Sequence, residues 1–207
     1  AVLVGLSKSL GVSLDFLMGG QVHELQSLEW RKTSNASAQD RAKAEMVVIG
    51  KLEDYLAIED ILEIQQPDNP FAEVRIDQVE DDDALDRKAL QVREKWQLGI
   101  DPIPSMTALL EDKGLKVIET DLPERINGMA CHVERADLPP TEVIVVARQT
   151  NVERKRFNLA HELAHRIIAG TENPSTRLEP AMNRFAGACL VPAEQLTALA
   201  GENQRAV

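Results

Sequence analysis

The segment H-E-L-A-H at residues 161–165 combines side chains that could do chemistry together. Residues four apart on an α-helix lie on one face, so the imidazoles of His161 and His165 can point at one position, where a divalent metal would be held. Glu162 projects about 100° round the helix from His161, and it can reach a water on that metal without being a ligand. Two imidazoles beside one carboxylate predict zinc-activated water chemistry.

The alternative is that these three residues are ordinary helix positions, with Glu162 a solvated charge. The flanking sequence argues against it, because the surrounding residues are mostly apolar and predict a buried helix. They are Phe157, Leu159, Ala160, Leu163, Ala164, Ile167 and Ile168. Unpaired polar groups inside such a helix would be costly, and a bound metal would satisfy all three.

A catalytic zinc needs a third protein ligand and keeps one coordination position open. Helical spacing of apolar residues predicts a second helix over residues 177–192, and Pro174 lies in the turn between the helices. An antiparallel pair of helices can then bring Glu179 to the metal. Two alternatives stay open: Glu179 could form a capping box with Thr176, and Glu172 in the connecting loop is a rival ligand.

The segments R-F-N-L-A-H-E-L-A-H and E-x-x-x-N-R-F-A-x-x-x-L-x-P together resemble the ImmA/IrrE family of bacterial metallopeptidases, over roughly residues 76–196. The resemblance implies that His161 and His165 bind Zn²⁺, that Glu179, four residues before Asn183, is the third ligand, and that Glu162 is the general base. It also implies a zincin-like core and limited proteolysis of a transcriptional repressor, in a stress response or in the control of mobile elements.

The composition sets broader limits on function. The chain has 207 residues, which suits one or two domains, and its net charge of −11 argues against a nucleic-acid binder along its whole length. Two cysteines are too few for a disulfide framework and suit a reducing cytoplasm. We expect no signal peptide. The longest apolar runs, such as 143–147, are too short to span a membrane.

The N-terminal residues 1–25 contain two short helical patterns, the second within L-G-V-S-L-D-F-L. This ending resembles the closing helices of a Cro/repressor-type (XRE) helix-turn-helix domain, and a small helical hairpin of another kind is the alternative. If the resemblance holds, the DNA-reading helix would precede residue 1, and DNA would be contacted through that part.

Residues 26–70 are expected to form a linker and a long helix over about residues 37–65, with Gly50 as a potential break. The apolar stripe of this helix is either a partner surface or a face packed on the next domain. A homodimer is a separate possibility that the sequence does not assign to any surface. The prolines Pro67 and Pro70 mark the boundary, and residues 71–207 form the expected metallopeptidase domain.

The order of elements after residue 71 is typical of a zincin-like core. It comprises two helices, three strands near residues 115–120, 126–133 and 142–148, and then the helix of the H-E-x-x-H motif. We therefore expect an α+β fold with a small mixed sheet packed on that helix, preceded by a helical N-terminal region. The third strand is the expected edge strand, which could pair with an extended substrate.

Two further residues leave alternatives open. His132 could donate a hydrogen bond to the substrate carbonyl, or it could be an ordinary strand residue with a local partner. Cys131 could be a metal ligand or a small core residue.

The function predicted from these observations is a zinc metallopeptidase in the cytoplasm that cleaves a protein substrate, such as a repressor. A different class remains open: a DNA-binding transcriptional regulator or antitoxin in which the zincin-like part serves sensing or dimerisation. A third reading is a purely structural zinc site, which would have no open coordination position.

Overall fold

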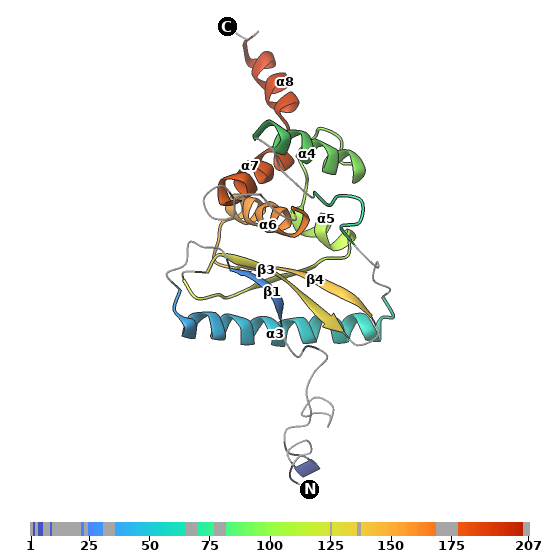
Figure 1. Cartoon of the computed structure of the whole chain (residues 1–207), viewed down its shortest axis with the longest axis vertical. Helices are drawn as coiled ribbons and strands as arrows, with labels where there is room; N and C mark the ends of the chain where they lie inside the picture. Colours follow the sequence, from blue (N-terminus) through green and yellow to red (C-terminus); the bar gives the residue numbers. More distant parts are fainter. Residues whose placement is uncertain are drawn as a thin grey trace.

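The computed structural model arranges six helices and four strands among the residues that it describes (Figure 1). The described residues are 2, 4, 5, 9, 22, 25–30, 36–64, 70–76, 82–124, 126–135, 138–168 and 178–204. The elements in chain order are β1 (Gln26–Trp30), α3 (Ala38–Ile61), α4 (Asp82–Lys95), α5 (Met106–Asp112), β2 (Lys116–Thr120), β3 (Gly128–Arg135), β4 (Leu138–Ala147), α6 (Val152–Ile167), α7 (Leu178–Leu190) and α8 (Ala193–Gln204).

The four strands form one mixed sheet in the order β1-β3-β4-β2. Strand β3 runs antiparallel to β1 and β4, whereas β2 runs parallel to β4. The three strands predicted from the sequence are confirmed as β2, β3 and β4. The predicted α+β fold, with a small mixed sheet packed on the motif helix, is confirmed as well.

The expectation that the third strand lies at the sheet edge is wrong. That strand is β4, and it lies between β3 and β2. Its central residues 143–146 are almost fully buried on both faces of the sheet, which is the environment of an interior strand. Among the described strands, the edges are β2 and the unpredicted β1.

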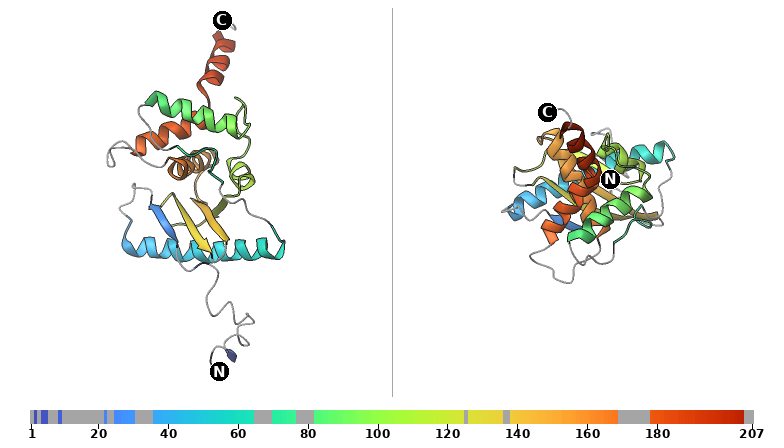
Figure 2. Two further views of the ribbon diagram at one scale, coloured as in Figure 1. Left: turned by 45° about the vertical axis from the view of Figure 1, so that its right-hand side comes forward. Right: turned by 90° about the horizontal axis from the view of Figure 1, so that it is seen from above.

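The sheet separates two hydrophobic cores. Successive residues of β3 and β4 point alternately into one core and the other, because side chains alternate between the faces of a sheet. Ala130 and Ile144 belong to the core beneath α6, whereas Met129 and Val143 belong to the core against α3. Figures 1 and 2 show the layers: α3 covers one face, α5 and α6 cover the other, and α7 and α4 pack beyond α6.

Helix α3 is continuous through Gly50, so the potential break does not occur. It begins with a capping box, in which Ser37 accepts a hydrogen bond from the backbone N–H of Asp40 and donates its own N–H to the Asp40 carboxylate. Its buried residues share a core with the sheet, and the buried ion pair between Glu59 and Lys116 joins its C-terminal part to β2.

The division of the chain into residues 1–25, 26–70 and 71–207 stays a prediction. The expected helix-turn-helix remnant lies outside the described residues, apart from a few isolated positions. In the part of the chain that the structure describes, no helix is both long and apolar enough to cross a membrane.

Helices α4 and α7 are fastened together by two arginines. The Arg93 side chain of α4 is buried and donates hydrogen bonds to the carbonyl oxygens of Gly99, Asp101 and Cys189. The last of these lies at the C-terminal end of α7, where carbonyl groups lack partners within the helix. Arg184 of α7 makes a bidentate pair with Asp86 of α4. These contacts hold α7 against α4.

Candidate metal centre

Helix α6 carries the H-E-x-x-H motif through the middle of the protein. Its N-cap is Asn151, whose side-chain oxygen accepts a hydrogen bond from the backbone N–H of Arg154 at 2.8 Å. The segment from Asn158 to Ala164 is buried between the sheet and α7. A buried, capped helix fixes the positions of the motif side chains.

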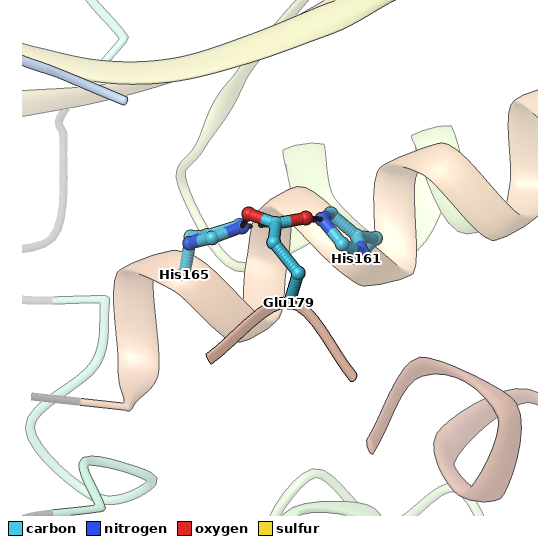
Figure 3. Close-up of side chains that lie close together, drawn as sticks. All are labelled: His161, His165 and Glu179. Carbon is cyan, nitrogen blue, oxygen red and sulfur yellow. Dashed lines mark hydrogen bonds and ion pairs between the residues drawn. The ribbon is translucent and has the colours of Figure 1, made fainter. Parts of the chain in front are cut away.

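Three side chains converge on one point at the interface of α6 and α7. The Nε2 atoms of His161 and His165 lie 3.1 Å apart. His161 Nε2 is 3.4 Å from Oε2 of Glu179, and His165 Nε2 is 3.4 Å from the other oxygen, Oε1. Figure 3 shows the Glu179 carboxylate between the two rings. The His161 side chain is fully buried, whereas the Glu179 side chain is 38% exposed, so the group opens to solvent on the α7 side.

The three groups are close enough to share one ion. Ligand atoms at about 2.0–2.1 Å from zinc in tetrahedral geometry would lie about 3.3 Å from one another. The two imidazole nitrogens are 3.1 Å apart, each faces a different oxygen of Glu179 at 3.4 Å, and one ligand atom from each residue lies within 4.8 Å of the others. Two imidazoles and one carboxylate are also a donor set that zinc accepts. His161, His165 and Glu179 are therefore a candidate metal site.

Glu179 lies in the first turn of α7, next to Pro180. A proline is tolerated there, because N–H groups of a first turn have no partner within the helix. The other two readings of this stretch involve Thr176 and Glu172, which lie outside the described residues.

Asn183 is a site residue whose role sequence reasoning missed. Its side-chain oxygen lies 2.9 Å from Nδ1 of His161. Because an amide oxygen only accepts, Nδ1 carries the proton and Nε2 keeps its lone pair for a metal. Asn183 follows Glu179 by four residues, which places both side chains on one face of α7. This four-residue spacing was the sequence feature that could have indicated a role for Asn183 at the site.

Glu162 turns toward the sheet, away from α7. It is 1% exposed, and its carboxylate packs on Gly128 of β3. A Cβ atom built on Gly128 would lie 3.2 Å from Oε1 of Glu162 and 2.9 Å from the carbonyl oxygen of Val145. The absence of a side chain at residue 128 therefore makes room for the Glu162 carboxylate.

His132 lies on the same face of β3 as Gly128 and has a local partner. Arg166 of α6 makes a bidentate pair with Glu142, at 2.7 and 3.0 Å, and its guanidinium also lies 3.4 Å from Nδ1 of His132. This is the environment that the ordinary reading of His132 expected, and a catalytic role for His132 remains a prediction.

Cys131 points to the opposite face of β3, into the core against α3. It therefore does not belong to this centre. Burial raises the pKa of the Cys131 thiol to about 12 and that of the Cys189 thiol to about 11. Both cysteines are core residues that stay protonated near neutral pH.

No curated protein matches the chain, but one protein-family model matches part of it. Residues 110–206 match a peptidase family model described as the IrrE N-terminal-like domain. The matched residues include His161, Glu162, His165 and Glu179, and the match supports a metallopeptidase-family function. The part of the chain that builds the candidate metal centre is thus similar to the IrrE N-terminal-like domain, which supports the resemblance to the ImmA/IrrE family.

Proposed function

We propose that this protein is a zinc-dependent metallopeptidase that hydrolyses a peptide bond in a protein substrate. The observation that supports this most is the convergence of His161, His165 and Glu179, whose ligand atoms lie within 4.8 Å of one another. Glu162 follows the first of these residues directly in α6, as the chemistry of a zinc peptidase requires.

Each residue has a separate proposed role. His161, His165 and Glu179 would hold the ion, and bound zinc supplies a lowered pKa for water and polarisation of the substrate carbonyl. Glu162 takes a proton from the attacking water and returns it to the leaving amine nitrogen. Asn183 keeps the His161 ring in the orientation and tautomer that a metal ligand needs.

A catalytic centre is favoured over a purely structural one by the number of ligands. Among the described residues, three side chains make up the candidate group, and no fourth His, Cys, Asp or Glu joins them. Structural zinc sites are closed by four protein ligands, whereas catalytic sites leave one position for water and substrate. The partial exposure of Glu179 adds a route by which a substrate could approach.

The substrate chain is proposed to bind in extended form along β1. This strand is an edge of the described sheet and lies beside β3, whose α6-facing side carries Gly128 and His132. An extended peptide can add to such an edge through backbone hydrogen bonds. This proposal replaces the one made for β4, which has strands on both sides.

The finer aspects of function rest on the ImmA/IrrE resemblance. The proposed substrate is a transcriptional repressor, cleaved in the cytoplasm in a stress response or in the control of mobile elements. DNA contacts through a helix-turn-helix domain are proposed from the resemblance of residues 1–25.

The first test separates the base from the ligands. Glu162→Gln should retain the metal and lose cleavage of a co-expressed repressor, because the amide cannot accept the proton. His161→Ala should lose both metal and cleavage. Metal content is measured by elemental analysis of the purified chain, and a chelator should stop cleavage by the unaltered protein. Full cleavage by Glu162→Gln would reject the base assignment.

A further inference from the structure

Helix α3 presents an apolar outer face that the sheet does not cover. Its inner face packs on the sheet through Ala44, Val48, Leu52 and Leu56. On the outer face, the exposed fractions are 75% for Met46, 41% for Val47, 57% for Ile58 and 80% for Ile61. Exposed apolar side chains at this density on one helix face indicate an interaction surface.

The outer residues repeat at the spacing of a helix–helix contact. Intervals of three and four residues connect Lys43, Met46, Gly50, Asp54, Ala57 and Ile61 along the helix. The apolar members of this line are Met46, Ala57 and Ile61, and helical spacing places Val47 and Ile58 on one flank of it. Together they make a seam for a second helix. Gly50 lies in the middle, and a Cβ atom built there would meet nothing within 4 Å. A second helix could therefore approach the α3 backbone closely at this point.

Charge along α3 differs between its two halves. Residues 38–52 contain Arg41, Lys43 and Lys51 together with Asp40 and Glu45, whereas residues 53–64 contain five acidic residues and no lysine or arginine. One of the five, Glu59, faces inward to Lys116, and another, Glu63, follows the last residue of α3, Ile61. A second α3 in parallel orientation would place the two acidic parts side by side, whereas an antiparallel one would place each acidic part beside the half that contains Lys43 and Lys51.

We propose that the outer face of α3 binds α3 of a second copy of this chain in antiparallel orientation. The two-fold axis crosses the outer face of α3 at the level of residue 52, and it makes the contacts self-complementary, as in any isologous dimer. In this register, Met46 lies opposite Ile58 of the second copy. Lys51 lies beside Asp54 of the second copy, and each contact occurs twice.

The size of the surface sets the expected strength. Helix α3 has 24 residues and is therefore about 36 Å long. One pair of helices of this length buries less than a standard protein interface, so we expect a dissociation constant on the order of micromolar. The net charge of −11 on each chain opposes association, which makes the local charge pairing more important.

The first experiment measures the mass of the full chain by sedimentation across a concentration series. The unaltered chain should rise from 22.9 kDa toward twice that mass. Met46→Glu and Ile58→Glu should each raise the dissociation constant at least about tenfold, since a charge would be buried where Met46 of one copy meets Ile58 of the other. Leu196→Glu in α8 is the matched control, because Leu196 is an exposed leucine (55%) away from α3, and it should leave the dissociation constant unchanged.

A charge exchange tests the antiparallel register. Lys51→Glu alone and Asp54→Lys alone each place like charges opposite one another at both symmetric contacts, so each should be mainly monomeric. An equimolar mixture should form heterodimers, because both contacts then join opposite charges. The ion pair within one chain between Lys51 and Asp54, at 3.9 Å, is lost in both variants and stays lost on mixing. Recovery can therefore come only from pairing between chains.

Three outcomes would overturn the proposal. The unaltered chain could remain monomeric at about 100 µM, the Met46→Glu and Ile58→Glu variants could dimerise as tightly as Leu196→Glu, or the charge mixture could stay monomeric. In the first case the face is covered by another protein or by another segment of the same chain. Circular dichroism and thermal unfolding of each variant check that the fold is kept.

Discussion

Replacement of Gly128 by alanine should reduce catalysis while leaving the metal in place. The new methyl group would lie 2.9 Å from the Val145 carbonyl oxygen and 3.2 Å from Oε1 of Glu162. Ordinary van der Waals contact begins at 3.4 Å. The backbone must therefore yield by about 0.5 Å and the carboxylate by about 0.2 Å, by subtraction, if each neighbour moves alone.

The two neighbours differ in how easily they can move. Gly128 pairs with Val146 in the β3–β4 ladder, so the Val145 carbonyl is held by adjoining strands. Overpacking of this kind typically costs about 1–3 kcal/mol of stability. The Glu162 carboxylate can retreat more cheaply, but a general base displaced by several tenths of an ångström loses alignment, and we expect kcat to fall about ten- to a hundredfold.

The assay compares Gly128→Ala with Gly187→Ala. Gly187 lies in α7, where an added Cβ atom would meet nothing within 4 Å, so alanine there should be neutral or stabilise by up to about 1 kcal/mol. For each variant, kcat and KM for the proposed repressor substrate, metal content and the free energy of unfolding are measured. Wild-type kcat and stability in Gly128→Ala would refute the reasoning, and so would loss of the metal together with activity.

Three further predictions concern the supports of the site and the buried thiols. Asn183→Ala should weaken zinc binding about 10- to 100-fold, because the His161 ring loses its acceptor; a competition titration against a chromophoric chelator measures this, and unchanged affinity would exclude the orienting role. Arg93→Met should lower the free energy of unfolding in urea by about 2–4 kcal/mol, since three carbonyls lose a buried donor; a loss below about 0.5 kcal/mol would contradict this. Cys131 and Cys189 should resist a thiol reagent until the chain unfolds. Their pKa values lie above the ordinary value of 9.0, so the unfolded chain ionises first. The contribution of the buried, protonated thiols to the free energy of unfolding is fully present below about pH 9. It falls as the pH rises toward 11 and 12, by up to about 1.4 kcal/mol per thiol for each pH unit. Urea unfolding from pH 7 to 11 checks the sign, and stability that rises above pH 9 would contradict it.

The features that sequence could predict are those set by local spacing. The i, i+4 relation of His161 and His165 fixes their common face once the helix is assumed, and the apolar run of residues 143–147 predicts a buried strand. An expected turn between two helices makes Glu179 a candidate ligand, with two alternatives left open. These inferences need only neighbouring residues, and the structure brings His161, His165 and Glu179 together.

Features that depend on distant parts of the chain were not predictable in this way. Strand β1 has no β-branched residue, so it lacks a strong strand signal, and it is a strand because it pairs with β3 about a hundred residues later. The full order of strands is likewise a tertiary property. The interior position of β4 is the exception, because the continuous apolar run of residues 143–147 is the pattern of a strand buried on both faces. The contact between Gly128 and Glu162 joins two elements, and neither segment signals it alone.

The proposed metal ligands and the proposed general base lie on opposite sides of helix α6. Substitutions on the two sides should therefore have different effects on metal affinity and on turnover. His161 and His165 turn toward Glu179 and Asn183 on α7, whereas Glu162 turns toward Gly128 on β3. Changes on the α7 side should therefore alter metal affinity first, with turnover recovering at high zinc concentration. Changes on the sheet side should lower turnover at full metal occupancy, and no excess of zinc should restore it. If added zinc rescued Gly128→Ala but not Asn183→Ala, the assignment of ligands to one side and base to the other would be reversed.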